Sequence, residues 1–155
     1  YETITYDLPA LEVAVITLRP GQKVLNIHIP SSGEPFDLNA RLQSYKLAYD
    51  FFKDLRGEGP LVCVCHSWLL YPEYRRVLGD SSNIISFQDD FTILEIDDGA
   101  FQDAWRVFGP AAEGPTEQLP EDTSMQRVFK KHLLSGGKNG SALGVLVFDG
   151  ERLLK

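Results

Sequence analysis

The sequence predicts a mixed α/β fold built around one parallel pair of strands. Two apolar runs rich in β-forming residues, 23–29 and 61–68, flank an amphipathic stretch at 37–56. A strand, a helix and a second strand joined by short links imply two parallel neighbouring strands with a right-handed crossover. Turn signals elsewhere, Pro-Gly at 20–21 and Asp-Gly at 149–150, indicate that antiparallel hairpins are added to this unit.

The composition is that of an acidic globular chain long enough for one core. The chain has 155 residues, of which 43% are hydrophobic. Its 22 Asp and Glu residues exceed the 15 Lys and Arg residues, so the formal net charge is −7 at pH 7. This balance, without a basic stripe, argues against nucleic acid and anionic membranes as partners. No apolar run approaches the roughly 20 residues of a membrane-spanning helix.

The N-terminal residues and the cysteines bear on the origin of the chain. A predicted strand follows Tyr1 at once, in place of a signal peptide, so we expect residues 1–155 to be a single domain from the C-terminal part of a longer protein. Cys63 and Cys65 are two residues apart in a predicted strand, so they share a face and cannot easily bridge each other. A Cys-x-Cys metal site would need a second pair of cysteines, which the sequence lacks. We therefore interpret both residues as buried free thiols of a cytoplasmic protein.

The residues before the central unit predict two further strands, 2–8 and 12–18, from their alternation of apolar and polar side chains. Arg19-Pro-Gly-Gln22 places Pro and Gly at the two central positions of a type II turn. We therefore expect 12–18 and 23–29 to form an antiparallel hairpin that leads into the central unit.

The helix expected over 37–56 has recognisable signals at both ends. Asp37 can cap it through its carboxylate, and Gly57 and Gly59 with Pro60 end it. Its apolar side chains follow a spacing of three and four residues, so one face packs on the sheet. These side chains are Leu38, Leu42, Tyr45, Tyr49, Phe52 and Leu55 or Arg56.

The second half of the chain predicts short helices and strands in alternation. We expect short helices over 72–78 and 100–108, a longer helix after the capping box at 123–126, and strands over 82–88, 91–96, 142–148 and 151–154. Asp89-Asp90 would link the first two of these strands, and Asp149-Gly150, a stronger hairpin signal, would link the last two. The three prolines within 110–120 indicate a loop.

Each of the two parallel strands carries a histidine near its carboxyl end, His28 and His66. Ligands of open α/β sheets bind outside these strand ends, so we expect both imidazoles at one crevice. A neutral imidazole there could accept a proton from an amine or hydroxyl nucleophile. The alternative is that each histidine only completes a strand. A metal site would need a third ligand, and His132 lies on a remote helical face of core residues, so we expect no metal.

Residues beside the two strand ends are candidates for ligand contacts. Ser67 follows His66, but the Gly-x-Ser-x-Gly pattern of a nucleophile elbow is absent. Trp68 comes where a pocket wall would be. Ser31-Ser-Gly-Glu34 lies between a strand and a helix and could offer backbone N–H groups to a phosphate, although Glu34 and Asp37 would repel one.

Several short stretches resemble one known family. They are His-Ile-Pro (28–30), Cys-His-Ser-Trp-Leu-Leu (65–70), Ser-Asn-Ile-Ile-x-Phe-Gln (82–88) and Leu-Pro-x-Asp-Thr-Ser-x-Gln (119–126). From about residue 7 to residue 155 the chain resembles the C-terminal domain of bacterial GNAT-like acyltransferase-domain proteins. The resemblance implies a mixed, mostly antiparallel sheet flanked by helices, with one parallel strand pair splayed apart. It also implies that acyl-CoA lies in the splay and that a separate N-terminal domain exists.

Two hypotheses for function follow. In the first, the chain is an acyltransferase that moves an acyl group from acetyl-CoA or another acyl-CoA to a small amine or similar acceptor. The resemblance then implies that His28 or His66 is a general base or proton relay, that Ser67, Trp68, Asn83 and Gln88 line the substrate pocket, and that Ile29, Ser31, Ser32 and Gly33 contact the cofactor. In the second, it is a non-catalytic GNAT-like module that binds a ligand or a partner, such as its own N-terminal domain. The second hypothesis is motivated by residues 30–41, which do not match the pyrophosphate loop Arg/Gln-x-x-Gly-x-Gly/Ala of the wider superfamily.

Overall fold

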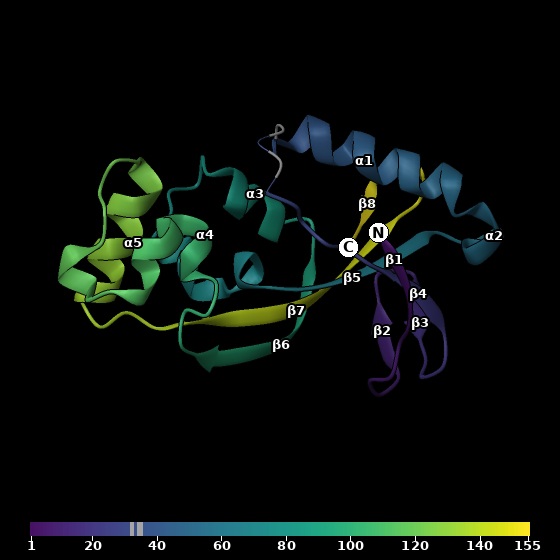
Figure 1. The fold of residues 1–155 in the computed structure, drawn as a ribbon. Coiled ribbons are helices and arrows are strands. Elements are labelled where there is room, and N and C mark those ends of the chain that lie inside the picture. The colour runs from purple at the N-terminus through teal and green to yellow at the C-terminus, as the bar shows by residue number, and fades with distance from the viewer. Residues whose placement is uncertain (32, 34–35) are drawn as a thin grey trace.

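A six-stranded mixed sheet is the centre of the computed structural model, which describes residues 1–31, 33 and 36–155 (Figure 1). The strands lie in the order β1-β4-β5-β7-β6, and β8 pairs with β7 off this path. Their bounds are Glu2–Thr5 (β1), Lys23–Asn26 (β4), Leu61–Ser67 (β5), Thr92–Gly99 (β6), Asn139–Phe148 (β7) and Leu153–Leu154 (β8). Only the β4–β5 ladder is parallel among the described strands, which confirms the mixed, mostly antiparallel sheet.

The crossover between the parallel strands is helical, as predicted. It consists of α1 (Leu38–Phe51) and the short α2 (Lys53–Arg56). Asp37 caps α1, because its Oδ1 accepts the backbone N–H of Ala40 at 2.9 Å. The strand–helix–strand prediction is therefore confirmed, with a break in the helix between α1 and α2.

Different elements cover the two faces of the sheet (Figure 1). Helix α1 packs on one face, where Cys63 and Cys65 lie in the larger apolar core. The hairpin of β2 (Leu11–Val13) and β3 (Ile16–Leu18) packs on the other face, in a second core that contains Val64. Successive side chains of a strand point to opposite faces, which separates Val64 from the two cysteines. Both cysteines are buried and free, and burial raises the pKa of the Cys65 thiol to about 12.

The N-terminal hairpin differs from the expectation. A single strand over 12–18 is wrong, because the chain turns at Ala14, whose φ is 50°, and β2 and β3 pair with each other in a separate sheet. The Pro-Gly turn is present, since the N–H of Gln22 donates to the carbonyl of Arg19 at 3.2 Å. The pairing of 12–18 with 23–29 is nevertheless wrong. Strands β1 and β5 occupy both edges of β4, so β3 has no free edge to join.

Residues 82–88 contain a helix, α3 (Asn83–Gln88), so the strand expected there is wrong. Ser82 caps this helix, with its Oγ accepting the N–H of Ile84 at 3.2 Å. A short apolar run such as this one has no period that distinguishes a strand from a helix. The hairpin expected between 82–88 and 91–96 therefore does not form, and β6 pairs with β7 instead.

Short helices surround an aromatic cluster beyond β5. They are η1 (Trp68–Leu70), η2 (Pro72–Arg76), α4 (Ala104–Phe108), η3 (Gly109–Glu113), η4 (Thr116–Gln118) and α5 (Ser124–Leu134). The expected loop over 110–120 thus holds 3-10 turns, and the expected helix over 100–108 begins at Ala104. The capping box of Thr123 and Gln126 opens α5 as predicted. Within the described part of the chain, no helix is both long enough and apolar enough to cross a bilayer.

The C-terminal hairpin is confirmed. Phe148 of β7 pairs with Leu153 of β8 across the predicted Asp-Gly turn, and Gly150 has the positive φ, 102°, that favours glycine there. Strand β7 begins at Asn139, three residues before the predicted start, and lies between β5 and β6. Strand β7 therefore connects the parallel pair β4–β5 to β6. This places polar residues of β5, β7 and β6 side by side.

Candidate active site

The parallel strands separate at their carboxyl ends. Their ladder ends at Asn26 and Val64, followed by one bond from the N–H of Ile27 to the carbonyl of Val64 at 2.9 Å. Strand β5 then continues beside β7 as far as Ser67. On the β4 side the chain reaches Pro30, which has no N–H to donate to a ladder. The two strands are therefore splayed.

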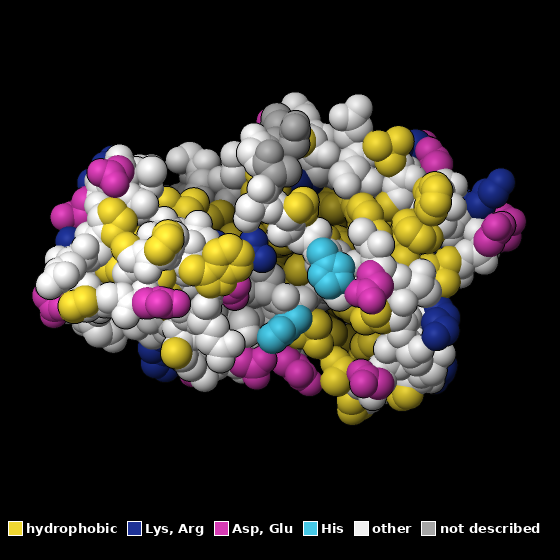
Figure 2. Space-filling model, viewed as in Figure 1, with side chains coloured by type: hydrophobic (Ala, Val, Ile, Leu, Met, Phe, Trp, Pro, Cys, Tyr) yellow, Lys and Arg dark blue, Asp and Glu magenta, His cyan; other side chains and the backbone are white. Residues whose placement is uncertain are grey.

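A cleft of about 320 Å³ lies in this splay. It is lined by both strand ends and by α4, through Ile27, His28, Ile29, Pro30, Ser31, Cys65, His66, Ser67, Trp68, Leu69, Asp103 and Arg106. Both predicted histidines are in this lining, in agreement with the crevice rule for parallel strands. Figure 2 shows two histidine side chains close to each other on one face of the molecule, beside a hollow in its surface.

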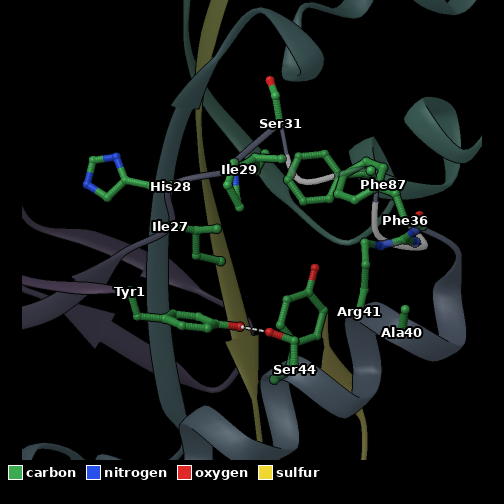
Figure 3. A pocket seen from close by; sticks show the side chains of 13 residues that line it. Tyr1, Ile27, His28, Ile29, Ser31, Phe36, Ala40, Arg41, Ser44 and Phe87 are labelled. Atoms are coloured by element: carbon green, nitrogen blue, oxygen red, sulfur yellow. Dashed lines mark hydrogen bonds between the residues drawn. The ribbon is translucent and has the colours of Figure 1, made fainter.

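His28 is bonded to the edge strand β1. Its Nε2 lies 2.8 Å from Oε2 of Glu2 and 3.2 Å from Nδ2 of Asn26. The hydrogen bond from His28 lowers the pKa of the Glu2 carboxyl. Figure 3 shows the imidazole pointing away from α1. The side chain is 65% exposed, so His28 lies at the rim of the cleft and is accessible to a ligand.

His66 belongs to a row of polar side chains that crosses three strands. The register pairs His66 of β5 with Leu143 of β7, and Asp97 of β6 with Ser141 of β7. Alternate residues of a strand share a face, so Ser141 meets His66 diagonally. The Nε2 of His66 lies 3.0 Å from Oδ2 of Asp97 and 3.1 Å from Oγ of Ser141. When Nε2–H donates to Asp97, Nδ1 is the nitrogen that can accept a proton.

A second cavity, of about 290 Å³, shares His66, Trp68 and Asp103 with the cleft. Asp97 and Asp98, at the end of β6, also line it. With Asp103, three carboxylates therefore line this cavity beside His66. A cavity lined by one sign of charge attracts the opposite sign, and this one favours a cationic group beside the imidazole.

The residues expected to line the substrate pocket divide into two groups. Ser67 and Trp68 line the cleft, although Oγ of Ser67 also accepts the N–H of Leu69 at 3.2 Å and Trp68 is only 7% exposed. Asn83 and Gln88 are not brought to it. Asn83 is exposed at the start of α3, and Nε2 of the buried Gln88 donates to the carbonyl of Leu69 at 3.0 Å. Neither side chain lines the cleft.

The residues expected beside the cofactor lie near the end of β4. Ile29 and Ser31 line the cleft, and Gly33 lines a neighbouring pocket on the α1 side. Ser32 lies outside the described residues. Oγ of Ser31 accepts a hydrogen bond from Nη1 of Arg106 at 3.0 Å. Arg106, which brings a positive charge to the cleft wall, was not identified from the sequence, because 75 residues separate it from its partner.

The carboxylate partners of the two histidines were also missed. Glu2 and Asp97 lie 26 and 31 residues from the histidines that they bond. The one signal for Asp97 in the sequence was the acidic pair Asp97-Asp98 directly after the predicted strand 91–96. That pair points to His66 only once the register of β6 against β7 is known. Among the described residues, no group of three or more His, Cys, Asp or Glu side chains is arranged to hold a metal ion.

Comparison with known proteins connects this architecture to acyltransferases. The profile of a family described as GNAT-like C-terminal domain matches residues 4–146. A solved acyltransferase in complex with decanoyl-CoA has a TM-score of 0.68 at 27% sequence identity over 81% of this chain. A mutant acyltransferase with octanoyl-CoA gives 0.68 and 26% over 83%, and an acyltransferase with CoA and 10C-Teicoplanin gives 0.67 and 25% over 83%. No curated protein matches the chain.

The likeness concerns one part of those longer proteins. The match covers 40% of the structure with decanoyl-CoA and 42% of the other two. The chain therefore spans about two fifths of the length of the solved structures that it matches, and within that part the arrangement of helices and strands is shared.

Proposed function

This chain belongs to the family of GNAT-like C-terminal domains, and on that premise we propose that it is the acyl-CoA-binding domain of an acyltransferase that acylates an amine. The observation that carries the proposal is the cleft between the splayed ends of β4 and β5, which has His28 and His66 in its walls. The similar solved acyltransferases hold CoA or acyl-CoA esters, which supports an acyl-CoA as the donor here.

The cleft walls offer suitable contacts to such a donor. Beyond Ile27 the backbone leaves the β4–β5 ladder, so its peptide groups are available to the amides of a pantetheine arm. Arg106 adds a guanidinium to the wall, and a guanidinium suits a phosphate group. Oδ1 of Asp103 lies 3.3 Å from Nε of Arg106. This ion pair orients the guanidinium and offsets part of its positive charge.

The acceptor amine approaches from the acidic cavity in this proposal. Aliphatic amines resemble the lysine side chain, whose pKa is about 10.4, so they are mostly protonated near neutral pH. The carboxylates of Asp97, Asp98 and Asp103 would attract this ammonium form, which releases one proton to solvent before it can attack. A base is still needed for the second proton, and His66 lies where this cavity meets the cleft.

In the proposed reaction the amine nitrogen attacks the carbonyl carbon of the thioester. A C–N bond forms, the C–S bond breaks, and CoA leaves as the thiolate. As the bond forms, the attacking nitrogen gives one of its two protons to Nδ1 of His66 and keeps the other in the amide product; Asp97 stabilises the imidazolium, which then passes its proton to the thiolate. His28 is the alternative base, because it lines the same cleft and bonds Glu2 in a similar pair.

The test measures release of the CoA thiol from acyl-CoA esters in the presence of a panel of small amines. His66→Gln should lower the rate by about 10²–10⁴-fold, the usual contribution of a general base, with little change in acyl-CoA affinity by calorimetry. His132→Gln is the matched control, since His132 bonds the carbonyl of Lys138 at 2.7 Å and does not line the cleft. Unchanged rates in both His66→Gln and His28→Gln would contradict the catalytic role. Binding without turnover in the wild type would favour the non-catalytic module.

A further inference from the structure

An apolar pocket of about 280 Å³ lies between the end of β4 and helix α1, and the mechanism proposed above leaves it unused. Figure 3 shows Ile27 and Ile29 on one side of it, with Phe36 and Phe87 at one end and α1 on the opposite side. The rings of Phe36 and Phe87 pack against each other with centroids 5.0 Å apart. The pocket therefore has a rigid wall of aliphatic and aromatic groups.

The polar side chains of this pocket are already engaged with protein partners. Among the lining residues that the structure describes, Tyr1 bonds Ser44, His28 bonds Glu2, Ser31 bonds Arg106, and Arg41 and Tyr45 bond Asp90. Arg41 in particular is 4% exposed and lies 2.7 Å from a carboxylate oxygen of Asp90, so its charge is neutralised within the protein. The lining thus suits an apolar ligand, and Arg41 does not serve as a phosphate site.

The apolar pocket adjoins the cleft in the splay. Residues 27–31 line both, so a group held between the strands lies next to the pocket. Away from Phe36 and Phe87, the hydroxyl oxygens of Tyr1 and Ser44 lie 2.9 Å apart and connect the N-terminal segment to α1 (Figure 3). One water molecule of the liquid takes about 30 Å³, so an acetyl methyl group would leave most of this pocket unfilled.

Resting on the proposed function, we propose that this pocket holds the acyl chain of the donor, which makes the donor a medium-chain acyl-CoA in preference to acetyl-CoA. The thioester lies in the splay, the chain runs past Ile27 and Ile29 into the pocket, and the Tyr1–Ser44 contact limits the length that fits. The pocket is thus the part of the site that determines specificity for the acyl group.

The experiment titrates the protein by calorimetry with CoA and with its acetyl, butanoyl, hexanoyl, octanoyl, decanoyl and dodecanoyl thioesters. Each methylene that becomes buried should lower the Kd about fourfold, until the chain fills the pocket and the Kd levels off. Ala40→Leu puts a larger side chain into the lining on a well-formed helix and should weaken octanoyl-CoA binding by roughly tenfold or more while leaving acetyl-CoA nearly unchanged. Asn39→Leu is the matched control, because this neighbouring residue is exposed and does not line the pocket.

A second variant tests the far end of the pocket. Tyr1→Ala removes the contact with Ser44 and should move the chain length at which the Kd levels off towards dodecanoyl. A Kd that does not depend on chain length, or an Ala40→Leu series that matches Asn39→Leu, overturns the acyl-pocket assignment while CoA binding still supports the proposed function. If Ala40→Leu does not fold, a Tyr1→Ala series of Kd values that matches the wild type also overturns the acyl-pocket assignment. If neither CoA nor any thioester binds, the proposed function itself is wrong, and this inference with it.

Discussion

Breaking the ion pair between Arg41 and Asp90 should strongly destabilise this fold. The pair joins α1 to the segment after α3, with Nε of Arg41 2.7 Å from Oδ2 of Asp90, and the two side chains are only 4% and 3% exposed. Nη2 of Arg41 also donates to Ser86, and the hydroxyl of Tyr45 donates to Asp90 at 2.8 Å. The perturbation that we consider is Asp90→Ala, which removes the counter-charge and leaves the guanidinium buried.

The expected loss follows from the burial of both charges. Breaking a buried ion pair by removing one partner costs about 3–5 kcal/mol of unfolding free energy, because the remaining charge is desolvated without compensation. For a domain of this size 1 kcal/mol shifts the Tm by about 2–4 °C, so Asp90→Ala should lower it by roughly 6–20 °C. Asp90→Asn keeps an acceptor for Tyr45 and loses only the charge, so its effect should lie between those of the wild type and Asp90→Ala.

Urea denaturation followed by circular dichroism measures this loss, provided that the m-value is unchanged. The control is Asp50→Ala on the same helix. Asp50 pairs with Lys46 at 2.9 Å, and both side chains are more than half exposed, so this substitution should cost only about 0–1 kcal/mol. An Asp90→Ala protein that is as stable as Asp50→Ala would refute the argument from buried charge.

Three further predictions concern other parts of the fold. Gly140→Ala should cost about 1–3 kcal/mol in urea denaturation, because the new Cβ would clash with the carbonyl oxygen of Asp97, and an unchanged midpoint would contradict this. Thr123→Ala should cost about 1 kcal/mol by removing the cap of α5, and a loss no greater than that of an exposed mid-helix Ala substitution would count against the capping box. Burial raises the pKa of Cys63 and Cys65, the latter to about 12, so both thiols should resist a thiol reagent until the protein unfolds. The contribution of the two buried thiols to the free energy of unfolding should be fully present below the unfolded thiol pKa of about 8.5 and should decline as the pH rises towards the folded pKa values. A urea midpoint that does not fall from pH 8 to pH 10 would contradict this pH dependence.

The elements predicted correctly carry strong local signals. The crossover helix has a capping carboxylate, an apolar face and a glycine stop within 37–60, and the Asp-Gly turn at 149–150 specifies its own hairpin. The two wrong strands lack such signals. Residues 82–88 form a short run whose four buried side chains, Ile84, Ile85, Phe87 and Gln88, have no useful period, and 12–18 alternates well enough to hide the turn at Ala14. Local pattern therefore decided the elements whose partners are close in the sequence.

The candidate site divides in the same way. His28 and His66 could be placed at one crevice from the sequence, because the carboxyl ends of neighbouring parallel strands must lie at the same edge of a sheet. Their partners Glu2 and Asp97 could not, because they come from strands whose neighbours and register are set by the packing of the whole sheet.

The sequence by itself thus determined the parallel unit, the helices with capping signals and the location of the two histidines, since each depends on periodicity, caps or strand direction. The tertiary structure alone decided that β7 lies between β5 and β6 and so brings Asp97 to His66, that α3 is helical, and that Arg41 of α1 is neutralised by Asp90. These features depend on contacts between residues far apart in the sequence, such as the 31 positions between His66 and Asp97 and the 49 between Arg41 and Asp90, or on which surfaces exclude water. No local pattern encodes such contacts, because the free energy that selects them comes from burying the whole core at once.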